Sequence, residues 1–203
     1  FVVDVKSTGL YKTDEVLKAN GATTVYWKTG HSYIKRKTAE LGALAGFEKS
    51  GHFFLAEPIG RGYDDGLVAA AAVLSMLDRN PDKRLSELKQ ALPDAWTSMT
   101  MSPHCSDETK YDVLEKLVAE YVALHAEGGS ICGRKIVEVI TVNGARVHLE
   151  DGSWVLVRAS SNKPELVVVV ESMRSADDMR DLFRQEMKPR LAAHGVDDYN
   201  QEI

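Results

Sequence analysis

The sequence predicts an α/β three-layer domain with a mixed, mostly parallel sheet, followed by an α+β domain with a small antiparallel sheet and helices on one face. In the first half, short apolar segments alternate with helical patterns, which favours parallel strands connected by helices. In the second half, one long helical pattern precedes four strand-like segments in direct succession. Turn-forming residues collect near residues 92–97, so we assign residues 1–95 to the first domain and 96–203 to the second.

The elements of the first domain follow from apolar runs and capping residues. Four short apolar runs are predicted as strands over residues 1–6, 23–27, 43–47 and 52–56. One helix is predicted to follow Thr13 as its N-cap and to end at Gly21, and a second is predicted over residues 32–41. The alanine-rich segment 66–78 predicts a third helix, packed closely against another part of the protein.

The second domain begins with a short strand predicted over residues 98–102 and a helix predicted from Ser106 to about Ala126. Asn-Gly and Asp-Gly dipeptides separate the segments that follow and predict tight hairpins. A last helix is predicted after Ser175, which forms a capping-box pattern with Asp178. Strands are predicted over residues 135–140, 145–150, 154–160 and 165–172.

The composition is that of a globular protein, with 44% apolar and 27% charged residues. A net charge of −5 argues against a nucleic-acid-binding surface, and the apolar runs are too short to span a bilayer. Cys105 and Cys132 match no metal-ligand spacing, so we interpret them as reduced thiols of a cytoplasmic protein. The chain opens directly on an apolar strand and has no initial methionine, so we expect it to be the C-terminal portion of a longer polypeptide.

Two polar side chains of the first domain lie where α/β sheets bind ligands. Lys6 follows the first apolar run, so its ammonium can hold an anion or a hydroxyl at the end of the sheet. His31 precedes a predicted helix, whose terminal amides attract anions. The alternatives are a solvated lysine at the end of a strand and a histidine with a purely structural role near the N-cap.

A third polar stretch, EKSGH at residues 48–52, separates two strand-like segments. Glu48 can accept hydrogen bonds from two neighbouring hydroxyls, and Ser50 can donate or accept, which suits the edge of a sugar. A serine hydrolase would need a nucleophile elbow, and this stretch lacks that pattern. The other alternative is a polar hairpin loop, in which His52 only shapes the turn.

A fourth polar stretch, residues 158–162, separates two strongly apolar strands. Its side chains supply a guanidinium fork, hydroxyls and an amide, the donors that bind a phosphate dianion. The alternative is a solvated hairpin turn, since serine and asparagine are common turn residues. The four candidate residues are Arg158, Ser160, Ser161 and Asn162.

Taken together, the stretches DVK, GHS, EKSGH, YDDG and RASSNKP resemble the C-terminal half of the α-D-phosphohexomutase superfamily, in particular its bacterial phosphomannomutase/phosphoglucomutase branch. The resemblance covers essentially the whole chain. It implies that the first domain is the sugar-recognising third domain of the family, lacking its first strand and helix, and that the second is the phosphate-binding fourth domain. Family members interconvert 1-phospho and 6-phospho hexoses through a phosphoserine, a magnesium ion and a bisphosphorylated sugar.

The resemblance also implies roles for individual residues. Glu48 and Ser50 match the loop that reads two sugar hydroxyls, Lys6 and His31 match residues that line the same pocket, and residues 158–162 match the phosphate loop. Two departures affect these roles. Phe47 stands where the family's sugar loop has glycine, and Lys49 fills the position that varies with substrate. In the phosphate loop, Ser161 stands where the family has asparagine or glycine, and Asn162 stands where it has threonine. Both side chains can still donate hydrogen bonds.

We therefore expect the full-length protein to be a phosphohexomutase that acts on mannose phosphates, glucose phosphates or both. The phosphoserine loop and the Mg²⁺ ligands would belong to missing N-terminal domains of the same polypeptide, so this chain would bind hexose phosphate and be inactive alone, with no catalytic residue of its own. Two alternatives remain open: a non-catalytic sugar-phosphate-binding module, and a phosphoglucosamine mutase, whose sugar loop usually has glutamine in place of Lys49.

Overall fold

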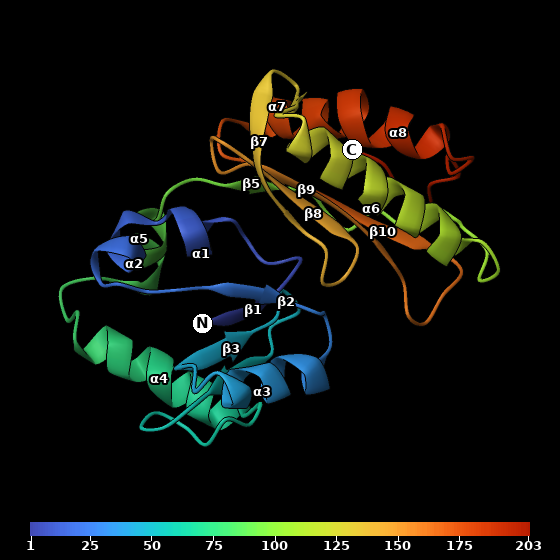
Figure 1. The fold of residues 1–203 in the computed structure, drawn as a ribbon. Helices are drawn as coiled ribbons and strands as arrows, with labels where there is room; N and C mark the ends of the chain where they lie inside the picture. The colour runs from blue at the N-terminus through green and yellow to red at the C-terminus, as the bar shows by residue number, and fades with distance from the viewer. The chain divides into compact units, whose positions relative to one another are not determined.

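The structure, a computed structural model, describes residues 1 to 203, which divide into two compact units, Phe1–Asp94 and Ala95–Ile203 (Figure 1). Each unit contains one sheet with its own helices. None of the helices combines the length and the apolar composition that crossing a bilayer requires. Both cysteines are free thiols, Cys105 buried and Cys132 exposed.

The sheet of the first unit has the strand order β2-β1-β3-β4. Its strands are β1 Val2–Asp4, β2 Val25–Trp27, β3 Ala45–Phe47 and β4 Phe53–Leu55. β1 pairs in parallel with β2 and β3, whereas β4 pairs antiparallel with β3. The prediction of a mixed, mostly parallel sheet is therefore confirmed. β1 is shorter than the apolar run because the chain turns after Asp4, whose carbonyl accepts a hydrogen bond from the amide of Ser7 at 2.9 Å.

The first unit contains more helices than the sequence predicted. They are α1 Leu10–Thr13, α2 Glu15–Ala19, α3 His31–Glu40, α4 Gly66–Asp78 and α5 Leu85–Gln90. The predicted N-cap at Thr13 is wrong, because Asp14 caps α2: its Oδ1 accepts a hydrogen bond from the amide of Leu17 at 2.9 Å. Thr13 instead ends the unpredicted helix α1, and its hydroxyl donates to the carbonyl of Gly9 at 3.3 Å.

Helix α4 is capped by Asp65, whose carboxylate accepts hydrogen bonds from the amides of Leu67 and Val68. Close packing of this helix was predicted, yet no residue of α4 is buried within the chain. Leu67 is 84% exposed and Leu74 is 65% exposed. The apolar composition of α4 therefore does not reflect burial in this unit.

Helix α3 lies against the sheet at unusually short range because β3 contains Gly46. A Cβ atom at this position would lie 2.3 Å from Oγ1 of Thr38 and 2.8 Å from Cγ2 of Ile34. Ile34 and Phe54 are fully buried in the small core beneath the helix. The missing side chain thus fixes the distance between β3 and α3, and with it the position of His31 at the start of the helix.

The sheet of the second unit has the order β5-β10-β9-β8-β7-β6, and its neighbouring strands pair antiparallel. Its strands are β5 Trp96–Thr97, β6 Ser130–Ile131, β7 Arg134–Ile140, β8 Ala145–Leu149, β9 Trp154–Ala159 and β10 Leu166–Ser172. The predicted strand over residues 98–102 is wrong. The amide of Ser98 donates to the carbonyl of Val170, and the amide of Met101 donates to the carbonyl of Val168. A step of three residues along this segment therefore matches a step of two along β10, which interrupts the regular strand pairing.

Helices cover one face of the second sheet, as predicted (Figure 1). They are α6 Lys110–Ala126, α7 Ala176–Leu182, the π-helix η1 Phe183–Met187 and α8 Lys188–Ala192. α6 begins at Lys110 rather than at the predicted Ser106, because Ser106 starts a turn in which its carbonyl accepts from the amides of Thr109 and Lys110. The core between helices and sheet includes Leu117, Val147, Val155, Val157, Val168, Val170, Leu182, Phe183 and Leu191.

The predicted capping box at α7 is half formed. Oγ of Ser175 accepts a hydrogen bond from the amide of Asp178 at 3.0 Å. The Asp178 carboxylate does not return this bond, because it accepts from Nη1 of Arg134 at 2.8 Å and from Oγ of Ser172 at 2.6 Å. The buried guanidinium of Arg134 thus draws the carboxylate away from the helix terminus.

The second face of this sheet carries charged and aromatic side chains beside the buried aliphatic residues Leu156 and Val169. The guanidinium of Arg146 lies 3.7 Å from the centre of the Trp154 ring, and Nε1 of Trp154 donates to Oε1 of Glu171 at 2.8 Å. Alternate residues of a strand share a face, so Arg158 lies on the same face as Trp154, at the end of β9. This register presents the Arg158 side chain away from the helices.

Candidate functional site

The carboxyl ends of the parallel strands in the first unit bring three of the predicted residues to one edge of the sheet. Lys6 follows β1, His31 follows β2 and opens α3, and Glu48 follows β3. β1 lies between β2 and β3, so these ends are neighbours. In α/β sheets this edge is where ligands bind.

The buried carboxylate of Asp4 organises this edge. Its Oδ1 accepts hydrogen bonds from Oγ of Ser7 at 2.7 Å and from the amide of Lys49 at 3.2 Å. Its Oδ2 accepts from Oγ1 of Thr29 at 3.1 Å and lies 3.8 Å from Nζ of Lys6. One side chain with no exposed surface thus holds the ends of β1 and β2 and the start of the 48–52 loop. The stretch DVK contains Asp4, but nothing in the sequence indicated this role.

Glu48 connects the 48–52 loop to the start of α3. Its Oε1 accepts a hydrogen bond from the amide of Gly30 at 2.8 Å, and the residue is only 7% exposed. Its Oε2 accepts no hydrogen bond within the chain. The loop itself is a tight turn, in which the amide of Gly51 donates to the carbonyl of Glu48 and Gly51 adopts a φ of 94°. Ser50 lies at the exposed tip of this turn.

His52 and Asp64 form a pair that sequence reasoning missed. Nδ1 of His52 lies 2.6 Å from Oδ2 of Asp64, and the amide of Phe53 donates to Oδ1 of Asp64 at 3.1 Å. Nε2 of His31 lies 3.8 Å from the same Oδ2, and the two imidazoles meet edge to face with ring centres 5.7 Å apart. Asp64 therefore orients His52 and approaches His31. The stretch YDDG that contains it was the available signal.

This pair gives the site a pH dependence. The hydrogen bond to Asp64 raises the pKa of His52 above its ordinary 6.5, and the same bond lowers the pKa of Asp64 below its ordinary 3.8. The stabilisation from a raised histidine is complete below pH 6.5 and is lost as the pH rises through the His52 pKa. The stabilisation from a lowered aspartate is complete above pH 3.8 and is lost as the pH falls through the Asp64 pKa. The pair therefore contributes fully between these two values.

We expect the Asp64→Asn variant to return the pKa of His52 toward 6.5, because an amide carries no charge to stabilise the imidazolium. The Cε1–H signals of the histidines, followed by NMR against pH, measure this shift. His194, which pairs with Glu120, is the internal control. An identical His52 titration in both proteins would contradict the pairing.

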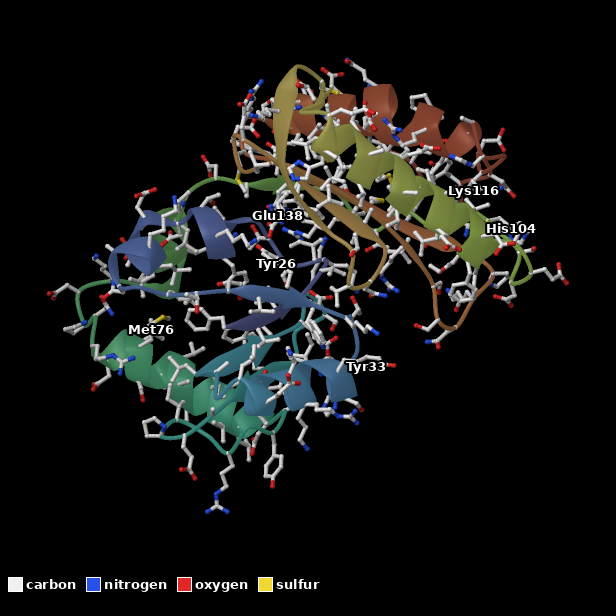
Figure 2. All side chains as sticks on the ribbon, viewed as in Figure 1. Tyr26, Tyr33, Met76, His104, Lys116 and Glu138 are labelled. Carbon is white, nitrogen blue, oxygen red and sulfur yellow. The ribbon has the colours of Figure 1, made fainter.

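In the second unit, the four predicted phosphate-binding residues lie on the end of β9 and in the turn that follows it. Nη1 of Arg158 donates to the carbonyl of Ala159 at 2.9 Å. Ser160 is 8% exposed, whereas Ser161 and Asn162 are exposed at the tip of the turn. The base of the turn is closed by the amide of Ser160, which donates to the carbonyl of Glu165 at 3.0 Å. On the far side of the turn, Glu165 forms an isolated β-bridge with His104, a residue that is labelled in Figure 2.

The hairpin between β7 and β8 approaches the backbone of β9 closely. A Cβ atom at Gly144 would lie 2.1 Å from the carbonyl oxygen of Val157 and 2.8 Å from Cα of Arg158. Gly144 also has a φ of 88°, which a side chain disfavours. The absence of a side chain here leaves room for Arg158.

The two groups of residues differ in chemistry. The first offers a buried carboxylate with one oxygen available, a hydroxyl and cationic side chains, and the second offers a guanidinium, hydroxyls and an amide. No group of three or more His, Cys, Asp or Glu side chains is arranged to hold a metal ion. These donors suit hydroxyls and an oxyanion such as phosphate.

Comparison with known proteins places both units. Residues 1–96 match "Phosphoglucomutase/phosphomannomutase, alpha/beta/alpha domain III", and residues 105–188 match "Phosphoglucomutase/phosphomannomutase, C-terminal domain". The phosphomannomutase/phosphoglucomutase of Pseudomonas aeruginosa is 33% identical over 190 residues, which are 92% of this chain and 37% of that protein. A probable phosphoglucosamine mutase of Methanosarcina barkeri is 28% identical over 171 residues, 84% of this chain and 35% of that protein.

A solved structure of a phosphoglucomutase/phosphomannomutase family protein from Burkholderia thailandensis is also similar. It aligns with a TM-score of 0.70 and 29% identity, over 94% of this chain and 37% of that one. The chain thus spans a little over a third of the length of the relatives it matches.

Proposed function

Since the chain belongs to the phosphoglucomutase/phosphomannomutase family, we propose that it is the C-terminal portion of a phosphohexomutase that interconverts hexose 1-phosphate and hexose 6-phosphate. The observation that carries the proposal is that the domain III unit holds donors and acceptors suited to hydroxyls, whereas the C-terminal unit holds donors suited to phosphate. Mannose and glucose phosphates are the substrates that we assign. The cytoplasm is the compartment that we assign, in keeping with two free thiols.

The first unit would recognise the sugar. Oε2 of Glu48, which accepts no hydrogen bond from the chain, would accept one from a sugar hydroxyl, and Ser50 would contact a neighbouring hydroxyl. Lys6 and His31 would line the same pocket. Asp4 and Asp64 would act as positioning residues. Asp4 is fully buried and holds the loop and Lys6, whereas Asp64 holds His52.

The second unit would hold the phosphate of the substrate. Arg158 would supply a charged fork, and Ser160, Ser161 and Asn162 would supply neutral donors around the same oxyanion. The bisphosphorylated intermediate must rebind with its two ends exchanged. A site that reads equatorial hydroxyls and a phosphate, which both orientations share, can accept it either way round.

The chain does not fit the remaining requirements of the reaction. It contains no set of side chains arranged to bind a metal ion, so we assign the Mg²⁺ site and the phosphoserine to N-terminal domains of a longer polypeptide. Bound Mg²⁺ would neutralise charge on the phosphoryl group during transfer. The residues of this chain would bind and orient the sugar phosphate and help to exclude water.

Lys49 distinguishes the proposed substrates from an amino sugar. Its side chain is exposed beside Glu48, at the position that varies with substrate. A cationic side chain there repels the ammonium group of glucosamine phosphate and disfavours the phosphoglucosamine mutase alternative.

A coupled assay of the longer polypeptide tests this function. We expect conversion of glucose 1-phosphate and mannose 1-phosphate to the 6-phosphates, with a lower kcat/KM for glucosamine phosphate. The isolated 203-residue chain should bind these compounds and turn none of them over, because it lacks the phosphate donor. Binding without turnover by the longer polypeptide would favour a non-catalytic sugar-phosphate-binding module. Turnover by the isolated chain would overturn the division of roles.

A further inference from the structure

The ammonium group of Lys110 lies beneath the turn that carries the proposed phosphate-binding residues. Lys110 is the first residue of α6, and it is only 3% exposed. Its Nζ donates to the carbonyl of Ser160 at 2.7 Å and to the carbonyl of Lys163 at 3.0 Å. Nζ also lies 2.5 Å from Oδ1 of Asp107. An ammonium has three donors, so this group is fully used by partners within the chain.

This placement is costly for the fold in two ways. Burial of a cation removes its hydration, and a positive charge at the N-terminus of a helix opposes the helix dipole. Asp107 offsets part of this cost by pairing with the ammonium, but its own side chain is 70% exposed, so only one member of the ion pair is buried. A methionine would fill the same space but could not donate to the two carbonyls of the turn. What the ammonium adds is therefore its hydrogen bonds to the turn.

The two carbonyls that Lys110 holds bracket the exposed tip of the turn. Ser160 and Lys163 lie on either side of Ser161 and Asn162, the two residues with no anchoring of their own side chains to the core. The base of the turn is fixed separately, by the bond from the amide of Ser160 to the carbonyl of Glu165 and by the amide of Cys105, which donates to the carbonyl of Pro164. The carbonyl of Lys163 also accepts from the amide of Glu165 at 2.9 Å, so Lys110 adds a second bond there and ties both carbonyls of the turn to α6.

We infer that Lys110 is a positioning residue for phosphate binding, which holds the peptide groups of the turn so that the side chains of residues 160–162 and the guanidinium of Arg158 converge on one oxyanion. The inference rests on the proposed function of this turn. Lys110 contacts no ligand itself, since its donors are occupied.

The test is an NMR titration of the 203-residue chain with glucose 6-phosphate, which reads the amide shifts of residues 160–162. Lys110→Met keeps the side-chain volume and removes the ammonium. We expect it to weaken binding about tenfold, as for the loss of charged hydrogen bonds that order a site. Lys116→Met is the matched control: it removes the same charge from the exposed surface of α6 (Figure 2) and should leave the dissociation constant unchanged.

A double-mutant cycle separates positioning from simple stabilisation. If Lys110 acts through the turn, the effects of Lys110→Met and Arg158→Ala should be less than additive, because each variant disrupts the same site. Lys110→Arg, which keeps the charge, should recover part of the affinity. A purely structural lysine would lower the melting temperature and leave both the affinity and the cycle unaffected. If Lys110→Met does not fold, Lys110→Gln and Lys110→Arg take its place in the same cycle.

The outcomes distinguish this inference from the function on which it rests. Equal binding by the unmodified chain and Arg158→Ala would remove the phosphate site altogether. Weakened binding by Arg158→Ala together with unchanged binding by Lys110→Met or Lys110→Gln would overturn the role of Lys110 alone.

Discussion

Replacing Arg158 by alanine in the longer polypeptide is expected to raise KM for glucose 6-phosphate about 100-fold, which corresponds to about 2.7 kcal/mol of lost binding free energy. The guanidinium lies at the end of β9, on the face away from the helices, and we propose it as the cation that contacts the phosphate directly. Loss of a charge-assisted, forked contact has this magnitude. We expect a smaller change in kcat, because ground-state and transition-state binding of the distal phosphate are weakened together.

Two further variants sharpen this experiment. Arg158→Lys should recover only part of the affinity, since a point charge cannot reproduce the fork. Arg174→Ala is the control for loss of an arginine from the same unit, because the Arg174 side chain is 52% exposed and pairs with Asp151. Steady-state kinetics of the three proteins give the comparison. An unchanged KM for Arg158→Ala would show that residues 158–162 are an ordinary hairpin turn.

Replacing Asp4 by alanine is expected to destabilise the first unit by about 3 kcal/mol. The carboxylate is fully buried and accepts hydrogen bonds from Ser7, Thr29 and the amide of Lys49. Its removal takes away the acceptor that these three donors share at the edge of the sheet. Because the loss releases the start of the 48–52 loop, sugar binding should weaken as well.

Urea unfolding followed by residue-resolved amide signals measures this effect, since the two compact units need not unfold in one transition. We expect the signals of residues 1–94 to shift to lower urea in Asp4→Ala and those of residues 95–203 to remain. Asp82→Ala, an exposed aspartate of the same unit, is the control. Coincident curves for Asp4→Ala and Asp82→Ala would contradict the role of Asp4.

Local patterns predicted most of the architecture. Alternating strand and helix signals identified the parallel sheet, and the two hairpin dipeptides identified the antiparallel one, because both signals are encoded within a few consecutive residues. Elements that depend on tertiary support were missed, such as the short helices α1 and α5. The sequence pattern could not distinguish Thr13 from Asp14 as the N-cap of α2, since both residue types are good caps.

The candidate site was predicted where it follows strand ends and missed where it depends on contacts between distant residues. These residues could be placed because Lys6 ends a predicted strand, Glu48 follows another, and His31 precedes a predicted helix. Asp4 and Lys49 are 45 positions apart, and Lys110 and Ser160 are 50 positions apart. No local pattern relates such pairs, so the residues that hold the loops appear only in the folded chain.

The close approach of Gly144 to β9 has a consequence for genetic experiments. In a selection for growth that depends on the proposed mutase activity, almost any side chain at position 144 would displace the backbone at Arg158 and would be lost from the surviving population. A mutational scan would then rank Gly144 alongside the arginine, although it has no side chain that could touch a substrate. Intolerance of side chains at position 144 would show that the backbone at Arg158 needs the space beside Gly144.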